Sequence, residues 1–134
     1  QIVTARGDFR KPDEVADVEH NSGVDLACMA VLGPRASGKS TLLNRLFGTD
    51  SAIANPLTGK GGTKGAWVAT GRAGGRPLVA LDTQGFEATA GDEAAVVAKV
   101  AMLSLALADC VVFNLWAADI GRVDAAGYSL LRTV

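Results

Sequence analysis

A glycine-rich run over residues 33–40 constrains this chain more than any other feature. It reads GPRASGKS, which matches the phosphate-binding spacing G-x-x-x-x-G-K-S. Its glycines let successive backbone N–H groups point inward at phosphate oxygens, Lys39 supplies a positive charge, and the Ser40 hydroxyl is suited to bind Mg²⁺. We therefore expect a buried strand before this run and a helix after it.

The residues on either side of the run fit this expectation. Residues 26–32 form an apolar stretch typical of a buried strand, and residues 40–47 have the spacing of a helix that ends at Gly48 as its C-cap. The apolar face of this expected helix consists of Leu42, Leu43, Leu46 and Phe47. The N-terminus of the helix would add its free N–H groups and its dipole to the phosphate site. The alternative interpretation is a glycine-rich turn with a stray lysine.

Length and composition are those of one α/β domain. The 134 residues are enough for a real core, and 16 glycines with 5% aromatic residues fit a loop-rich domain built on Ala, Val and Leu. The net charge of −1 gives no indication of nucleic acid or of a basic membrane-binding patch. The most apolar stretch, residues 102–118, is interrupted by Asp109 and Asn114, so we expect a soluble chain.

The cysteines and the histidine give no indication of a metal site. Cys28 and Cys110 both lie in apolar, strand-like runs, which predicts two buried free thiols rather than a disulfide or a metal pair. His20 stands alone in a polar stretch, so we expect it at the surface.

The rest of the chain predicts strands that alternate with helices. We expect an N-terminal extension or edge segment at residues 1–23, with a short strand at 1–4, and the front part of a nucleotide-binding domain at residues 24–134. Within that domain the expected elements are a mobile loop at 49–63, strands at 65–71, 78–81 and 110–116, a hairpin-like connection at 73–77, and helices at 92–108 and from 124 onward.

These elements indicate an α/β fold. The run at 110–116 lacks alternation, which suits a strand buried on both faces of a largely parallel sheet. The helix at 92–108, capped by Asp92 or a neighbour, carries an apolar stripe of Val96, Val100, Leu103 and Leu107. We expect a P-loop NTPase fold resembling a G domain, which is a three-layer sandwich with a mostly parallel sheet, either complete or truncated at its C-terminal side.

A second nucleotide-site element follows the strand at 78–81. Residues 82–85 read DTQG, a D-x-x-G motif in which Asp82 would hold Mg²⁺ through its water shell and the Gly85 N–H would meet the γ-phosphate. Thr63, in the preceding loop, could reach Mg²⁺ with its hydroxyl group and the γ-phosphate with its backbone. Thr58 is a competing candidate, and composition alone does not separate the two threonines.

Catalysis needs further groups near the γ-phosphate. Arg35 could stabilise the charge that spreads over the phosphates during transfer, or it could be a solvated side chain at the loop apex. Ser37 could cap a phosphate oxygen or simply fit the turn. Gln84 precedes Gly85, so it does not stand where small GTPases keep their water-positioning glutamine; Phe86 stands there and cannot orient water. Catalysis would therefore depend on Arg35, Ser37, the loop backbone or a partner.

At this point the chain resembles a known family. The runs GKSTLLN at 38–44, LFGT at 46–49 and TKGAW at 63–67 resemble the dynamin-superfamily GTPases that fuse endoplasmic-reticulum membranes. ADCVVFNLW at 108–116, DIGR at 119–122 and LLRTV at 130–134 resemble the root-hair-defective/Sey branch of that superfamily, with atlastins as more distant relatives. The resemblance covers roughly residues 24–134 and implies that they are the front part of a GTPase domain.

The resemblance also implies an activity and a set of partners. It implies Mg²⁺-dependent GTP hydrolysis, dimerisation of the catalytic heads when GTP is bound, and a place on the cytosolic face of the endoplasmic reticulum. Membrane tethering would come from segments outside this chain. Between the two candidate threonines, the resemblance favours Thr63.

Motif and resemblance together give the expected site residues. The metal-binding positions are Ser40, Thr63 and Asp82. The catalytic candidates are Arg35, Ser37, Thr63 and Gln84. The positions expected to bind GTP or GDP are Gly33, Pro34, Arg35, Ala36, Ser37, Gly38, Lys39, Ser40, Thr41, Asp82 and Gly85.

Several residues depart from the pattern of the branch. A glutamate is typical where Gln84 stands, and residues 86–91 carry little charge for a switch segment. Arg35 occupies a slot where dynamin relatives often carry glutamine, whereas atlastins place their catalytic arginine at the slot of Ala36. No base-recognising Asp motif occurs in these 134 residues. Two alternatives therefore stay open: a nucleotide-binding assembly module with little or no turnover, and an ATPase with the same phosphate cradle.

Overall fold

The computed structural model describes residues 1–10, 26–53, 62–86 and 91–122. In chain order its elements are β1 (Ala27–Leu32), α2 (Lys39–Phe47), β2 (Ala66–Ala73), β3 (Arg76–Thr83), α3 (Asp92–Leu107), β4 (Cys110–Phe113) and a short 3₁₀ helix (Ala117–Asp119). The strands and helices expected between residues 26 and 116 are therefore present, with shifted ends.

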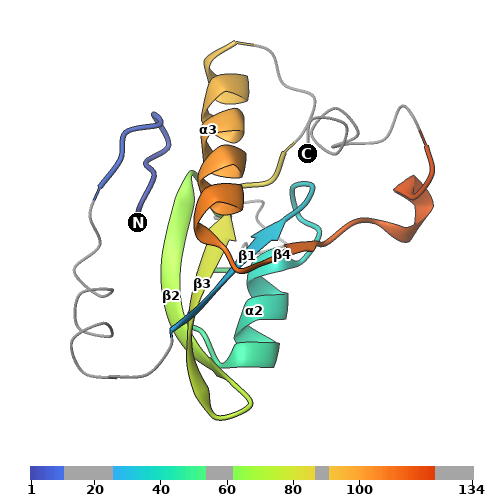
Figure 1. Ribbon diagram of the computed structural model, residues 1–134. Helices are drawn as coiled ribbons and strands as arrows, with labels where there is room; N and C mark the ends of the chain where they lie inside the picture. The colour runs from blue at the N-terminus through green and yellow to red at the C-terminus, as the bar shows by residue number, and fades with distance from the viewer. Residues whose placement is uncertain (11–25, 54–61, 87–90, 123–134) are drawn as a thin grey trace.

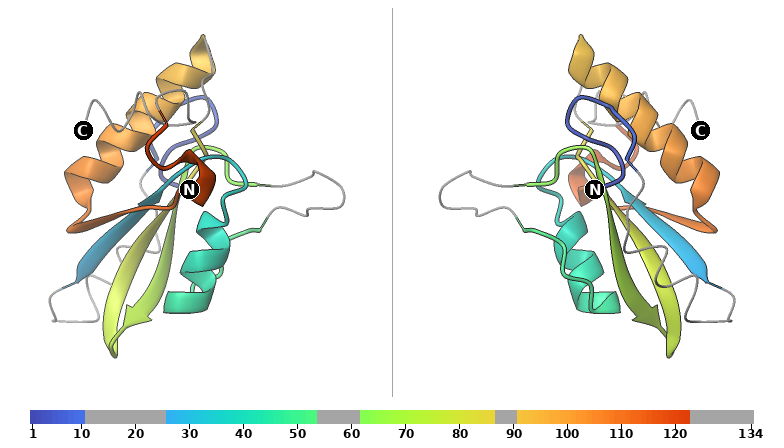
Figure 2. Two further views of the ribbon diagram at one scale, coloured as in Figure 1. Left: turned by 90° about the vertical axis from the view of Figure 1, so that its right-hand side faces the viewer. Right: turned by 90° about the vertical axis from the view of Figure 1, so that its left-hand side faces the viewer.

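The strands of the described part form one four-stranded sheet in the order β2-β3-β1-β4. β1 pairs in parallel with both β3 and β4, whereas β2 and β3 form an antiparallel hairpin. Gly74 and Gly75, with φ angles of 55° and 83°, make the tight turn of this hairpin. Helix α2 covers one face of the sheet and α3 the other (Figures 1 and 2). The expected three-layer α/β fold with a mostly parallel sheet is thus confirmed.

The core lies on both faces of β1. Val31 packs with Leu43 of α2 and with Ala80 of β3. Its neighbour Ala30 points to the other face, because successive strand residues alternate, and it packs with Leu81 in a separate cluster. Burial on both faces explains why the run at 26–32 is apolar without alternation.

Residues 1–10 contribute to the core. Val3 has no exposed surface and packs with Ala66 of β2 and with Val96 and Val100 of α3. The strand expected at residues 1–4 is reduced to isolated bridges of Val3 with Ala66 and Phe9. The assignment of residues 1–23 to a separate extension stays a prediction, because residues 11–25 lie outside the described ranges.

Helix α3 buries only part of the expected stripe, namely Val96 and Val100. Leu103 is only half-buried and Leu107 is 48% exposed. Its buried residues are Val96, Val100, Ala101 and Ser104. The expectation is confirmed for Val96 and Val100 and wrong for Leu107. Apolar residues occur all around this helix, so their spacing does not single out one face. Gly91, rather than Asp92, is the N-cap residue. Within the described ranges, no helix is both long and apolar enough to cross a bilayer.

Strand β4 is shorter and less buried than expected. It ends at Phe113 instead of Trp116 and is half-buried, because it lies at the edge of the described sheet. Cys110 at its start is exposed and Cys28 is half-buried, so the expectation of two buried thiols is wrong. Leu46 of α2 is also 62% exposed, although it was expected on the apolar face. Other expectations fall outside the described residues: those for His20, for Thr58 and for the helix from residue 124.

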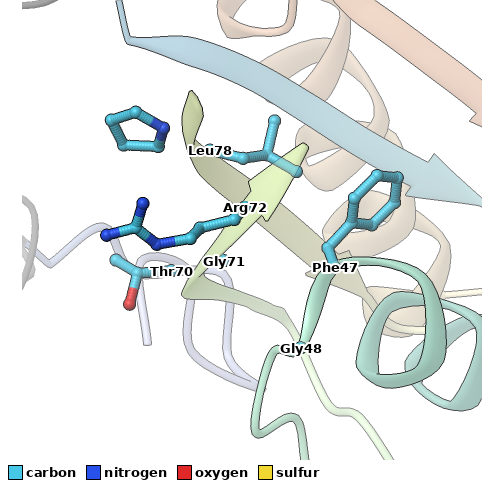
Figure 3. Close-up of a pocket in the computed structure, with 7 residues that line it drawn as sticks. Phe47, Gly48, Thr70, Gly71, Arg72 and Leu78 are labelled. Carbon is cyan, nitrogen blue, oxygen red and sulfur yellow. The ribbon is translucent and has the colours of Figure 1, made fainter. Parts of the chain in front are cut away.

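The two ends of helix α2 have different surroundings. Its N-terminus lies at the carboxyl ends of β1 and β3, so the loops that follow both strands meet there (Figure 1). At its other end an open groove runs between α2 and the β2-β3 hairpin (Figure 3). The groove is lined by Phe47, Gly48, Thr70, Gly71, Arg72, Pro77 and Leu78.

Candidate nucleotide-binding site

The loop at residues 33–38 curls tightly between β1 and α2. Gly38 has a φ angle of 92° and Ala36 a φ angle of 58°, so both residues are in the left-handed region. Glycine adopts this conformation freely, whereas for an L-residue it costs about 1–2 kcal/mol. The strain at Ala36 is of the kind that gathers at ligand-binding loops.

Two glycines allow the loops around the site to approach closely. A Cβ atom on Gly85 would lie 2.3 Å from the backbone N of Arg35, and one on Gly33 would lie 2.2 Å from the backbone O of Asn114. The Phe86 N–H also donates to the Gly33 carbonyl, with 3.2 Å between N and O. The D-x-x-G segment after β3 therefore lies directly against the phosphate-binding loop.

The Lys39 side chain is buried beneath this loop. It is only 6% exposed, and its Nζ donates to the carbonyl oxygens of Gly33 (3.1 Å) and Pro34 (2.7 Å). An ammonium group in this place gives the loop the positive charge that phosphates require. The same charge lies close enough to Asp82 to favour the ionised carboxylate.

Three oxygen-bearing side chains converge next to the loop. The Ser40 Oγ donates to Asp82 Oδ2 at 2.7 Å, and the Thr63 Oγ1 donates to the same oxygen at 3.1 Å. The Ser40 and Thr63 hydroxyls are themselves 3.1 Å apart. These residues come from the first turn of α2, from β3 and from the segment before β2. The fold thus brings together the three residues expected to bind Mg²⁺.

Asp82 is a carboxylate with an unusual environment. It is 1% exposed, and burial raises its pKa. Hydrogen bonds from Ser40 and Thr63, the Lys39 charge and the nearby Ser51 hydroxyl act in the opposite direction. Its second oxygen, Oδ1, is buried without a hydrogen-bond partner among the described residues. Clustered hydroxyl and carboxylate oxygens with one acceptor unused fit a hard divalent cation such as Mg²⁺, which binds oxygen ligands and keeps several waters.

Gln84 joins the two segments that flank the cluster. Its Oε1 accepts a hydrogen bond from the Gly65 N–H at 2.6 Å, and its own N–H donates to the Gly65 carbonyl at 2.8 Å. This double contact holds the Thr63 segment against the residues after Asp82. Gln84 therefore has a positioning role in this arrangement, and a direct catalytic role stays a prediction.

The other candidates lie on the loop and the first turn of α2. Arg35 is exposed, and its Nη2 lies 3.5 Å from the Glu93 carboxylate on α3. Ser37 accepts two contacts from the Asn114 amide, at 2.8 Å to its backbone O and 3.3 Å to its Oγ. Thr41 is half-buried in the first turn of α2. Their catalytic and binding roles stay predictions.

The sequence analysis did not identify two asparagines that support the site. Asn44 stands one helical turn after Ser40, so both share a face of α2, and its amide binds the backbone of Ser51. Asn114 directly follows β4, and its N–H donates to the Leu32 carbonyl at 2.7 Å. Both could have been found from the sequence. Asn44 follows Ser40 by one helical turn, and Asn114 directly follows a parallel strand, whose carboxyl end is where such sites form.

These features define a class of protein. A phosphate-binding loop joins a central parallel strand to a helix, and a buried carboxylate from the neighbouring strand contacts the serine of that loop. This is the arrangement of a P-loop nucleotide-binding domain of the G-domain type. The chain belongs to the family of the Root hair defective 3 GTP-binding protein (RHD3) GTPase domain, whose model matches residues 32–134.

Curated relatives agree with this assignment. The chain is 42% identical over 118 residues to "Protein SEY1 homolog" of Dictyostelium discoideum, covering 84% of this chain and 13% of that protein. It is 40% identical to "Protein ROOT HAIR DEFECTIVE 3 homolog 2" of Oryza sativa subsp. japonica, covering 84% and 14%. It is 33% identical to "Protein sey1" of Schizosaccharomyces japonicus, covering 100% and 18%. The chain thus spans less than a fifth of the length of these relatives.

Proposed function

We propose that this domain binds GTP with Mg²⁺ and hydrolyses it to GDP and phosphate. The observation that carries the proposal is the contact of Ser40 and Thr63 with Asp82 beside the phosphate-binding loop. The loop and Lys39 would bind the β- and γ-phosphates, and Ser40, Thr63 and Asp82 would hold Mg²⁺. When bound, Mg²⁺ neutralises negative charge on the phosphates.

The chemical step needs positioning rather than covalent catalysis. Water attacks the γ-phosphorus on the side opposite the oxygen that bridges to the β-phosphate. The bond between the γ-phosphorus and this bridging oxygen breaks, and GDP and phosphate leave. Thr63 would respond to the γ-phosphate, and the Gln84 contacts with the segment that carries Thr63 support this role. Arg35 would leave the Glu93 carboxylate to stabilise the charge that develops on the phosphates. Its exposed ion pair is weak enough for this exchange.

The proposal extends to the whole protein. We propose that nucleotide binding drives self-association of the domain and that the complete protein uses it in fusion or remodelling of the endoplasmic-reticulum membrane. This extension rests on the resemblance to the root-hair-defective/Sey branch. Any membrane contact would come from segments outside this chain, at the cytosolic face of the membrane.

A second candidate is a nucleotide-binding assembly module with little turnover. The observation in its favour is that Phe86, which is 3% exposed, stands in the position after the D-x-x-G motif where a water-positioning glutamine is used elsewhere. Arg35, the other candidate for catalysis, is paired with Glu93.

Nucleotide binding and turnover separate these candidates. We expect Lys39→Ala to weaken binding of a fluorescent GTP analogue by at least 100-fold, since the charge beneath the loop is lost. Arg45→Ala removes an exposed cation from the same helix and should leave affinity unchanged. Unchanged affinity in Lys39→Ala would overturn the site assignment.

Single-turnover hydrolysis of GTP and ATP should then show a preference for GTP that is lost in Lys39→Ala. Tight binding without turnover would favour the assembly module, and equal rates with both nucleotides would favour an ATPase. Light scattering with a transition-state mimic of the γ-phosphate tests self-association. A monomeric mass under all conditions would contradict the proposed self-association.

A further inference from the structure

The Ser51 hydroxyl, which is buried like Asp82 Oδ1, has no role in the function described so far. Asp82 Oδ1 and Ser51 Oγ are both shielded from solvent, and neither has a hydrogen-bond partner in the described part of the chain. Buried polar atoms are almost always paired in folded proteins. Each of these oxygens therefore keeps hydrogen-bonding capacity that the described residues do not use and that a ligand or an ordered water could take up.

The fold places Ser51 there by a specific device. Helix α2 ends at Gly48, whose φ angle of 65° turns the chain back along the helix. The Asn44 side chain then binds both backbone polar groups of Ser51. Its Nδ2 donates to the Ser51 carbonyl (2.9 Å), and its Oδ1 accepts from the Ser51 N–H (2.8 Å). Thr49 donates to the same Oδ1 at 2.7 Å.

The position of Asn44 on the helix brings this segment to the metal ligands. Asn44 lies one turn from Ser40, and the Ser40 hydroxyl contacts Asp82 Oδ2. The Ser51 hydroxyl is close enough to Asp82 to lower the pKa of its carboxyl group. Oδ2 already accepts from Ser40 and Thr63, whereas Oδ1 accepts from none of the residues that the structure describes, so Oδ1 is the oxygen available to a further donor.

We propose that Ser51, held in place by Asn44, is a positioning residue of the magnesium site. One water of the Mg²⁺ hydration shell would contact both the Ser51 hydroxyl and Asp82 Oδ1. This inference rests on the proposed function, because it requires that Mg²⁺ and nucleotide bind at Ser40, Thr63 and Asp82. It adds an outer contact that fixes the orientation of the carboxylate and of one metal-bound water.

The test is a magnesium titration of the protein bound to a fluorescent, non-hydrolysable GTP analogue. Removal of an outer-shell contact commonly weakens metal binding by 10-fold or more. Ser51→Ala should therefore raise the half-saturating Mg²⁺ concentration by about 10-fold, while affinity for the analogue in EDTA stays within about twofold of wild type. Ser51→Thr keeps the hydroxyl group and should restore most of the magnesium affinity.

Asn44 and a distant serine provide the controls. Asn44→Ala should weaken Mg²⁺ binding in the same direction, and adding Ser51→Ala should cause little further loss, because both changes remove one contact. Ser104→Ala removes a buried hydroxyl that bonds within α3 and should leave the titration unchanged. Circular dichroism establishes that each variant is folded. If Ser51→Ala unfolds, Ser51→Cys takes its place in the comparison.

The possible outcomes separate the two proposals. If Asp82→Ala abolishes the magnesium dependence and Ser51→Ala and Ser51→Cys leave it unchanged, the role of Ser51 is wrong and the proposed function stands. If the wild-type protein binds the analogue without any magnesium dependence, the proposed metal site itself is wrong. A loss of affinity in EDTA equal to that in Mg²⁺ would show that Ser51 supports the loop rather than the metal.

Discussion

At the scale of single residues, Asp82 dominates the site. This carboxylate is 1% exposed, and one of its oxygens has no hydrogen-bond partner within residues 1–10, 26–53, 62–86 and 91–122. It therefore opposes folding when ionised, yet the proposed magnesium site requires the ionised form. The hydroxyls of Ser40 and Thr63 and the charge of Lys39 offset part of this cost. Such a conflict between stability and ligand binding is typical of functional residues.

Replacement of Asp82 by asparagine should make this conflict measurable. Since the folded-state pKa of Asp82 is raised, its contribution to stability is fully present below the unfolded value of about 3.9 and is lost as pH rises through the folded value. The amide introduced by Asp82→Asn does not titrate. Without Mg²⁺ and nucleotide, the Tm of Asp82→Asn minus that of wild type should increase with pH across this window.

The measurement is a series of thermal melts from about pH 4 to pH 8, around the ordinary pKa of an aspartate. At neutral pH, Mg²⁺ with a GTP analogue should raise the Tm of wild type and not that of Asp82→Asn. A difference in Tm that is constant over the whole pH range would contradict the raised pKa.

Gln84 offers a second prediction at this scale. Gln84→Ala leaves the buried Gly65 N–H without its acceptor, which should cost about 1–3 kcal/mol of unfolding free energy. Gln84→Glu keeps an acceptor oxygen and should cost less. Because the contact holds the segment that carries Thr63, Gln84→Ala should also reduce the preference for GTP over GDP. Denaturant unfolding and competition binding measure the two effects, and equal stability of both variants would contradict the assigned contact.

At the scale of elements, the site depends on close packing between the loops that follow β1, β3 and β4. The phosphate-binding loop touches Gly85 after β3 and Asn114 after β4. Lys39 and Ser40 come from the helix that the same loop begins. Small changes in the distance between these loops should therefore affect binding more than they affect folding.

Gly85→Ala tests that packing. The added Cβ would lie 2.3 Å from the backbone of Arg35, so one of the two loops has to move. We expect affinity for GTP to fall by at least 10-fold. Gly74→Ala is the matched control, because Gly74 lies in the hairpin turn and no atom of the described residues lies within 4 Å of its added Cβ. Its left-handed φ angle predicts a loss of about 1 kcal/mol in stability without a change in affinity. Equal affinities in both variants would contradict the close approach.

The ion pair between the loop and α3 leads to a further prediction. The Arg35–Glu93 pair is exposed on both sides and contributes about 0–1 kcal/mol. If Arg35 has to leave Glu93 to act on the phosphates, Glu93→Gln should raise kcat by up to about 5-fold with little change in Tm. Arg35→Ala should lower kcat at unchanged KM, and both effects should be smaller at high salt. A lower kcat in Glu93→Gln would contradict this role of the pair.

Element by element, the sequence predicted what is local in the chain. The strand, loop and helix at 26–47 and the position of Asp82 follow from short motifs whose chemistry is contained in consecutive residues. Of the buried face of α3, Val96 and Val100 were predicted but Ala101 and Ser104 were not, because Met102 and Leu105 also make its outer side apolar. The contact of Asn44 with Ser51 depends on how the chain turns after Gly48, which no motif of the site includes.

At the scale of the whole molecule, the parallel strands explain why the site is where it is. β1 and β3 run in the same direction, so the loop with Lys39 and the segment with Asp82 both leave the sheet at the carboxyl ends of these strands. The relation of Thr63 to that edge could not be obtained from the order of the elements, because it depends on the antiparallel pairing of β2 with β3. The choice of Thr63 over Thr58 thus needed the resemblance.

The bonds from Lys39 to the carbonyls of Gly33 and Pro34 have a thermodynamic consequence. They fix the curvature of the cradle through the protein's own side chain, so the loop does not have to be ordered by a ligand. A preorganised site loses little conformational entropy on association. At protein concentrations where the domain stays monomeric, isothermal calorimetry of nucleotide binding should accordingly show a small heat-capacity change, well below that of a segment that folds as it binds.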